Sequence, residues 1–204
     1  MPSSAPRRLV LLGDSILDNG SYTSPAPDTT AHVRRKLDAG WTVECGARDG
    51  ATMRQVAAQF MALPPGRPAV VVLSVGGNDL LETRQALPPA TAPAARILSA
   101  FHQVAEDLGA RYAKLLESLR PAADRWIVCT IYDVPLTDPE MALLSRVALA
   151  TMNDHIQRAA WRHGAEVLEL RDVCTRPEDF VLEIEPSAEG ARKIATAIVN
   201  AVTG

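Results

Sequence analysis

Short apolar runs alternate with longer amphipathic segments from one end of the chain to the other, and this alternation constrains the fold more than any other feature. Five runs are rich in valine, leucine and isoleucine without strict polar alternation, as in strands that are covered on both faces. They occupy residues 8–12, 41–45, 69–75, 126–132 and 165–170. The pattern predicts a parallel sheet wrapped by helices.

The segments between these runs repeat apolar residues at spacings of three and four, which predicts helices with one buried face. Two are long, over 98–119 and 144–159, and a third closes the chain with Ser187 as its N-cap. Right-handed crossovers then give an α/β fold: a three-layer, doubly wound sheet of five parallel strands in the flavodoxin-like order 2-1-3-4-5. Proline and glycine cluster at 24–28, 64–68 and 88–93, between the predicted elements, so we expect loops there and one domain over residues 1–204.

Composition and charge exclude several classes of function. The chain has 204 residues, of which 47% are apolar and 22% charged, as is ordinary for a soluble globular protein. Its formal net charge of -3 supplies no basic field to attract nucleic acid. Residues 1–8 hold no apolar stretch suited to a signal peptide, and the run at 9–12 is only strand-sized, so we expect a cytoplasmic protein without a membrane partner. No pattern specifies an oligomeric state.

The cysteines give no sign of a metal site. Cys45, Cys129 and Cys174 are odd in number and widely spaced, with neither a Cys-x-x-Cys pair nor clustered histidines. We expect buried free thiols, and neither a metal nor a cofactor.

Polar motifs follow three of the predicted strands at their carboxyl ends, the edge where doubly wound sheets bind ligands. Gly-Asp-Ser at 13–15 follows the first strand, Asp-Gly-Ala-Thr at 49–52 the second and Gly-Gly-Asn-Asp at 76–79 the third. The Ser15 hydroxyl would share this edge with the Asn78 side chain, which can donate to an oxyanion. Taken alone, Gly-Asp-Ser also fits a turn or a helix cap, and the glycines also fit a phosphate cradle.

Together these motifs resemble the SGNH (GDSL-type) hydrolase family, and the likeness extends to the segment 184–190 before the last helix. The resemblance implies that Ser15 is a nucleophile. It also implies an oxyanion hole formed by the Ser15 amide, the Gly50 amide and the Asn78 side chain. The supporting residues that it implies are Asp14, Gly77 and Asp79.

The closing block of the family is where the match fails. The family pattern is Asp-x-x-His, whereas residues 182–185 are Leu-Glu-Ile-Glu. A serine hydroxyl needs a neighbouring group to accept its proton, and loss of triad members removes orders of magnitude of rate. The usual base and the acid that orients it are therefore both missing.

Glu185 occupies the histidine position and is the first candidate for a replacement base. Its ordinary pKa of about 4.3 makes it ionised but weakly basic at neutral pH. Burial, or a second carboxylate such as Asp179 or Glu183, would raise that pKa. The alternative is that Glu185 caps the closing helix, whose N-terminus favours an anion and would lower the pKa.

The four histidines offer one further candidate. His32 falls near the start of the segment after the first strand, close to the carboxyl edge, although no motif supports it. His163 precedes the fifth strand and belongs at the opposite edge, while His102 and His155 lie within long helices.

The function expected from these observations is hydrolysis of an ester, with an acyl or acetyl group passing to Ser15 and Glu185 in the histidine position. Such a protein would be a serine esterase or acylhydrolase acting on a small-molecule ester. A catalytically silent binding protein, a pseudoenzyme that recognises an acylated or carboxylate-bearing ligand, is the alternative, and the missing aspartate and histidine favour it. A scaffold or dimer module is a third hypothesis, supported only by generic helices.

Overall fold

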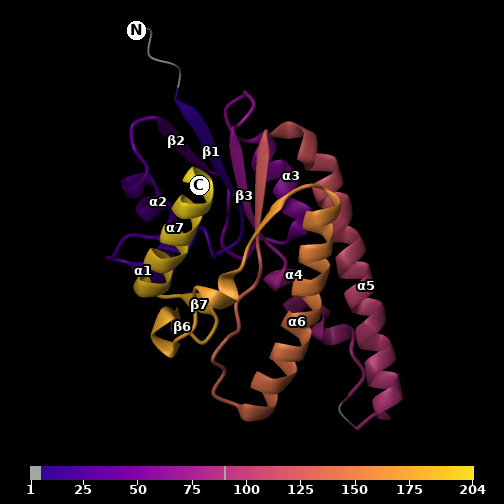
Figure 1. Cartoon of the computed structure of the whole chain (residues 1–204). Helices are drawn as coiled ribbons and strands as arrows, with labels where there is room; N and C mark the ends of the chain where they lie inside the picture. Colours follow the sequence, from indigo (N-terminus) through magenta and orange to yellow (C-terminus); the bar gives the residue numbers. More distant parts are fainter. Residues whose placement is uncertain (1–5, 90) are drawn as a thin grey trace, which may run out of the picture.

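Five parallel strands form the central sheet in the order β2-β1-β3-β4-β5, which confirms the predicted order (Figure 1). They are β1 (Arg7–Gly13), β2 (Trp41–Cys45), β3 (Val70–Ser74), β4 (Arg125–Cys129) and β5 (Glu166–Leu168). This computed structural model describes residues 6–89 and 91–204. Two predictions lie partly outside the described residues: the one on the start of the chain, at residues 1–5, and the one on the third predicted loop, at residue 90.

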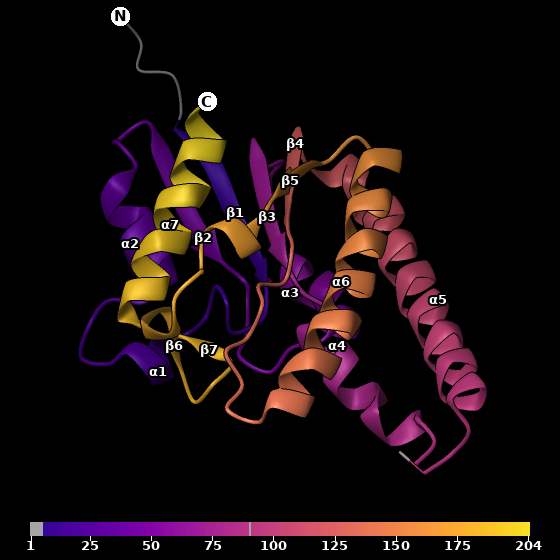
Figure 2. The same ribbon diagram turned by 60° about the horizontal axis from the view of Figure 1, so that its bottom comes forward.

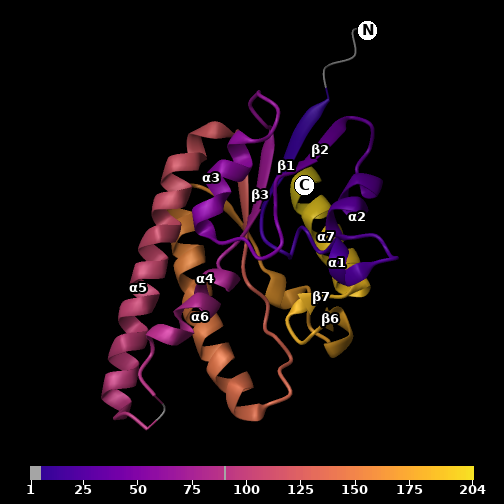
Figure 3. The ribbon, with the colours of Figure 1, turned by 180° about the vertical axis from the view of Figure 1, so that it is seen from behind.

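Helices cover both faces of the sheet, as predicted for a three-layer fold (Figures 2 and 3). On one face lie α3 (Met53–Met61), α5 (Ala94–Leu119) and α6 (Pro139–Arg162), and on the other α2 (Thr29–Lys36) and α7 (Ala188–Thr203). Successive residues of a strand point to opposite faces, so Val10 and Leu12 join the first apolar layer whereas Leu9 and Leu11 join the second. The sheet therefore separates two apolar cores.

Shorter elements lie mostly at the carboxyl edge of the sheet. They are α1 (Gly20–Thr23), α4 (Gly77–Glu82), the antiparallel pair β6 (Phe180–Val181) and β7 (Glu185–Pro186), and 3₁₀ turns at Thr83–Ala86, Arg120–Ala122, Leu170–Asp172 and Pro177–Asp179. The β6–β7 hairpin was not predicted, because two residues per strand leave no periodic signal.

Three of the predicted strands are too long; the third, expected over 69–75, is longer by one residue at each end than β3. The fourth was expected to reach residue 132, but β4 ends at Cys129. Both backbone groups of Ile131 bond to the buried Asn153 side chain, at 2.7 Å each, and so are lost to the ladder. The fifth was expected over 165–170, but β5 ends at Leu168 and a 3₁₀ turn begins at Leu170.

The remaining local predictions are mostly confirmed. Ser187 is the N-cap of α7, and its hydroxyl oxygen accepts a hydrogen bond from the Gly190 amide. All three cysteines are free; Cys129 and Cys174 are buried, whereas Cys45 is only partly so. Over the described part of the chain, no helix combines the length and apolarity needed to cross a bilayer.

Candidate active site

The first motif forms a tight turn at the end of β1. Gly13 has a φ of 129°, and a Cβ there would overlap the Ser74 carbonyl oxygen, so only glycine fits. The buried Gln59 side chain accepts from the Gly13 amide at 2.9 Å and donates to its carbonyl at 2.8 Å. The Asp14 amide donates to the Ser74 carbonyl at 3.0 Å. The turn leaves Ser15 at the carboxyl edge with 8% of its surface exposed.

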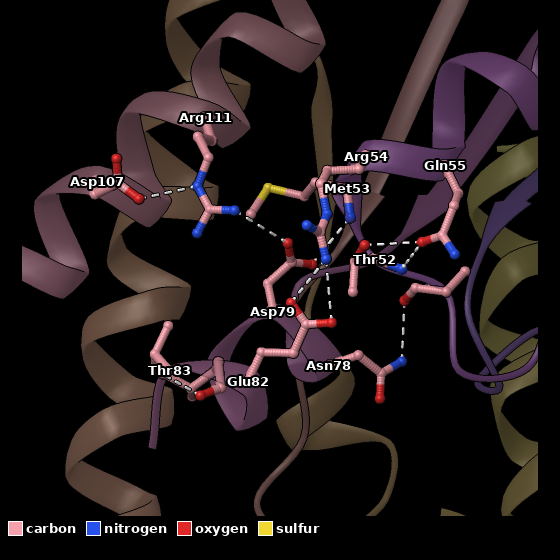
Figure 4. Close-up of polar contacts among 12 residues, drawn as sticks. Thr52, Met53, Arg54, Gln55, Asn78, Asp79, Glu82, Thr83, Asp107 and Arg111 are labelled. Atoms are coloured by element: carbon pink, nitrogen blue, oxygen red, sulfur yellow. Dashed lines mark hydrogen bonds and ion pairs between the residues drawn. The ribbon is translucent and has the colours of Figure 1, made fainter. Parts of the chain in front are cut away.

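Hydrogen bonds connect the three motif loops. The Arg48 amide donates to the Gly13 carbonyl at 2.9 Å, which joins the first loop to the second. The Asn78 Nδ2 donates to the Ala51 carbonyl at 3.0 Å, which joins the second to the third (Figure 4). Gly50 is exposed between them with a φ of 73°, and Gly77 begins α4. The structure thus gathers the segments that carry Ser15, Gly50 and Asn78 at one edge.

Asp79, at the start of α4, connects the third motif loop to the helices next to it. Its side chain is buried, and Oδ2 accepts from the Met53 amide at 2.9 Å, which fixes the start of α3. Its Oδ1 lies 3.7 Å from Nη1 of Arg111 on α5 (Figure 4). Burial raises the pKa of Asp79, whereas the Met53 amide and Arg111 lower it. Asp79 therefore connects α4 with α3 and α5.

Glu185 lies in β7 with its carboxyl group half-buried beside Ser15. Burial raises the pKa of Glu185 above the ordinary value, the nearby Ser15 side chain lowers it, and the charge of Asp49 raises it further. Within the described part of the chain, Oε2 of Glu185 is buried without a hydrogen-bond partner. Since Ser187 caps α7, Glu185 is not the cap of that helix.

The two carboxylates expected beside Glu185 lie elsewhere. Asp179 is fully buried, forms an ion pair with Lys193 at 2.7 Å and accepts backbone hydrogen bonds from the turn before it. Glu183 is exposed and accepts from the amide and hydroxyl of Thr137, at 3.0 and 2.6 Å. The carboxylate whose charge raises the pKa of Glu185 is instead Asp49.

The histidines are separated from the serine. His32, in α2, has its pKa lowered by burial and by the charges of α2 and α7, at Arg35, Lys36 and Arg192, while Asp28, the N-cap of α2, raises it. His155 packs on the α5 backbone at Gly109, where a Cβ would overlap its ring. The other two histidines lie in α5, at His102, and at the C-cap of α6, at His163. Of the candidate bases, the structure brings Glu185 to Ser15.

Asp14, which the family resemblance implies as a supporting residue, lies at this edge together with two residues that the sequence did not indicate, Asn19 and Tyr132. Asp14 is buried, and burial is the main cause that raises its pKa to about 8, with the charges of Glu185 and Asp79 adding to it. Asn19 and Tyr132 contact the backbone on either side of Glu185. The only sign of these residues in the sequence is a polar side chain beside an apolar run, and this pattern does not tell which group the side chain would contact in the folded protein.

Residues 11–193 match the model of the GDSL-like lipase/acylhydrolase family. The chain belongs to this family. The match spans nearly the whole sequence and confirms the resemblance that the three motifs indicate. No curated protein matches the sequence of this GDSL-like family member.

Solved structures of esterases and lipases share its fold. LAE5, an α/β-hydrolase enzyme from the metagenome of Lake Arreo, Spain, is 20% identical with a TM-score of 0.70, over 98% of this chain and 96% of that one. The acetylxylan esterase Axe2 from Geobacillus stearothermophilus is 17% identical with a TM-score of 0.71, over 100% and 97%. An extracellular lipase from Streptomyces rimosus is 18% identical with a TM-score of 0.72, over 97% and 100%.

Proposed function

We propose that this GDSL-like family member is a serine esterase or acylhydrolase in which Ser15 attacks the ester carbonyl and Glu185 accepts the serine proton. The observation that carries the proposal is that the half-buried carboxyl group of Glu185 lies near enough to the Ser15 side chain for Ser15 to lower its pKa. A nucleophile and a base within hydrogen-bond reach are what covalent catalysis requires. Burial, by raising the pKa of Glu185, makes it a stronger base than an exposed glutamate.

In the proposed reaction, the Ser15 Oγ forms a bond to the carbonyl carbon while its proton moves to Glu185. The negative charge that develops on the carbonyl oxygen is met by the amides of Ser15 and Gly50 and by the Asn78 side chain. One hydrogen of the Asn78 amide bonds to Ala51, which leaves the second for the oxyanion. Protonated Glu185 then returns its proton to the departing alkoxide, and an alcohol leaves.

The second half of the reaction uses the same groups. A water molecule gives a proton to Glu185 as its oxygen attacks the acyl carbon on Ser15. Collapse of this intermediate breaks the bond to Oγ, which takes the proton back from Glu185, and a carboxylic acid is released. No metal or cofactor is needed for this balance.

The substrate class follows from the family and from similar structures. The family is named for lipases and acylhydrolases, and one structural neighbour is an acetylxylan esterase. Catalytic mutants of that esterase replace a serine in one case and a histidine in the other. We infer a small acyl or acetyl ester as the substrate of this chain, with a carboxylate in place of the histidine.

The silent binding protein is kept as a second candidate because of one observation. Leu182, at the position of the family's orienting aspartate, is 75% exposed and supplies no group to orient a base. A protein of this kind would retain the hydrogen-bond donors but lack turnover. It would bind an acylated or carboxylate-bearing ligand through Ser15, Gly50 and Asn78.

Hydrolysis of p-nitrophenyl acetate by the wild type, Ser15→Ala and Glu185→Gln tests the proposal. We expect Ser15→Ala to abolish turnover and Glu185→Gln to lower kcat about 100-fold to 10,000-fold, the usual contribution of a general base. Wild-type activity should rise with pH through one titration above about 4.3, the ordinary pKa of glutamate, because only the ionised carboxylate accepts a proton and burial raises this pKa. Ser21→Ala, an exposed serine in α1, is the matched control and should be unaffected.

Two outcomes would contradict the proposal in different ways. Full activity of Glu185→Gln would exclude Glu185 as the base and return attention to His32. Absence of turnover in the wild type on acetyl, butyryl and longer acyl esters would favour the silent binding protein.

A further inference from the structure

Glu185 belongs to a hairpin too short to fix its own position. The pair β6–β7 has two residues in each strand, with Val181 opposite Glu185. Two residues at its tip, Leu182 and Glu183, have φ values of 50° and 67°, a region that side chains other than glycine seldom adopt. Since even a full-length isolated hairpin is marginally stable, the placement of Glu185 must come from contacts outside the hairpin.

Two buried side chains hold the backbone on either side of Glu185. The Tyr132 hydroxyl donates to the carbonyl oxygen of Ile184 at 2.8 Å. The Asn19 Nδ2 donates to the carbonyl oxygen of Pro186 at 3.2 Å. The residues immediately before and after Glu185 are therefore each tied to another part of the fold.

Both donors are themselves fixed. Asn19 is completely buried four residues after Ser15, and its Oδ1 accepts from the Thr29 amide at the start of α2 at 2.9 Å. Tyr132 is buried after β4, and its ring packs edge-on against Phe180, with 4.9 Å between the ring centroids. Asn19 thus connects the loop of the nucleophile directly to the strand of the candidate base.

We propose that Asn19 and Tyr132 are positioning residues that set the geometry between Ser15 and Glu185, in place of the orienting acid that the closing block lacks. In a serine triad, the third residue orients the base. Here Leu182 cannot do so, and the orientation comes from the two backbone carbonyls that flank Glu185. This inference rests on the proposed function.

The test uses variants that remove each donor and keep the shape. Tyr132→Phe removes the hydroxyl and keeps the ring on Phe180, and Asn19→Asp keeps an acceptor for the Thr29 amide but loses the donor to Pro186. With p-nitrophenyl acetate, we expect each variant to lower kcat about 10-fold to 100-fold, because small misplacements of reacting groups cost rates of this order. KM should change less than about 2-fold.

The pH profile separates positioning from a merely structural role. When Glu185 is held less closely to Ser15, the Ser15 side chain lowers the pKa of Glu185 less, so the acid limb of the kcat profile should move to higher pH. The facing groups that also titrate or carry charge are Asp14 after β1, Asp49 after β2, Tyr22 in α1 and Tyr132 itself. Asp14, Asp49 and Tyr22 are unchanged in both variants, and Tyr132→Phe removes a phenol whose pKa burial raises far above the acid limb. Because Asn19→Asp adds a carboxyl group of its own, the shift of the acid limb is measured in Tyr132→Phe.

Tyr112→Phe is the matched control for loss of a buried hydroxyl, because the Tyr112 hydroxyl is buried without a hydrogen-bond partner in the described residues. Asn200→Asp, at an exposed site in α7, is the control for the amide. Both should keep the wild-type kcat and pH profile. If Asn19→Asp does not fold, Tyr132→Phe alone decides.

The outcomes distinguish this inference from the proposed function. Wild-type kcat and an unmoved acid limb in Tyr132→Phe, together with an inactive Glu185→Gln, would overturn the positioning role and leave Glu185 as the base. An inactive wild type or a fully active Glu185→Gln would overturn the proposed function and the positioning role with it.

Discussion

At the scale of single residues, two carboxyl groups of the candidate site, those of Asp14 and Glu185, have different surroundings. Asp14 is buried, with its Oδ1 accepting from the Ile16 amide at 3.2 Å, and its pKa is raised to about 8. Glu185 is half-buried, and the nearby Ser15 side chain lowers its pKa while burial raises it. At neutral pH, Asp14 is mostly protonated and adds little negative charge to the candidate site. Neighbouring carboxyl groups can take separate roles when their surroundings shift their pKa values apart.

The buried Asp14 makes a prediction about stability. The unfolded chain loses this proton near pH 3.8 and the folded chain near pH 8, so between these values the folded state binds more protons. The free energy of unfolding should therefore fall as pH rises, by up to about 1.4 kcal/mol per pH unit from this group. Asp14→Asn should remove that slope, as measured by urea unfolding at pH 5, 6.5 and 8.

The control for this experiment is Asp172→Asn, because Asp172 is exposed. It should leave the slope of the wild type in place. A slope that persists in Asp14→Asn would show that another buried group is responsible, and Asp79, whose pKa burial also raises, would be the next to test.

The sequence identifies some of these residues and cannot identify others. Ser15 and Asn78 are predictable because each follows a recognisable strand, and parallel strands end at a common edge. Glu185 is predictable because it occupies a known position in the closing block. Asn19 and Asp49 are not, since their roles depend on contacts formed only in the folded chain; Asn19 and Pro186 are 167 residues apart.

At the scale of elements, side chains from two helices bond to the backbone where the strands that these helices cover come to an end. Gln59 of α3 bonds to both backbone groups of Gly13, and Asn153 of α6 bonds in the same way to both groups of Ile131. Each buried amide satisfies one donor and one acceptor that the sheet would otherwise satisfy. This explains why the apolar run 126–132 overpredicts β4: hydrophobic periodicity continues past the point where the backbone leaves the ladder.

We expect Asn153→Ala to lower the free energy of unfolding by about 2–5 kcal/mol. It would leave the Ile131 amide and carbonyl buried without partners, and each such group costs about 1–3 kcal/mol. Chemical denaturation measures the loss. Asp154→Ala, which removes the exposed ion pair of the next residue with Arg158, is the control and should cost less than about 1 kcal/mol. Equal losses in the two variants would contradict the role given to Asn153.

At the scale of the whole molecule, one sheet separates two apolar layers and brings the motif loops to one edge. Ile156 of α6 lies in the layer with α3 and α5, and Ile198 of α7 lies in the layer with α2; both are fully buried. The layered order was predictable because each element carries its own periodicity and crossovers are right-handed. The hairpin that contains Glu185 was not predictable, because its position depends on contacts with other elements.

The common sheet predicts that the two layers lose their structure together while mutations in them act independently. Ile156→Val and Ile198→Val each remove one buried methyl group and should each lower the free energy of unfolding by about 0.5–1.5 kcal/mol. Because the sheet lies between the two sites and they share no partners, the double variant should show the sum to within about 0.5 kcal/mol. Urea unfolding followed by far-ultraviolet circular dichroism and by tryptophan fluorescence, to which the buried Trp126 of β4 contributes, should give coincident transitions in all four proteins. Two separated transitions, with Ile198→Val moving only one of them, would mean that the layer of α2 and α7 unfolds without the other, and the β6–β7 segment that carries Glu185 would then be exposed in a partly folded state.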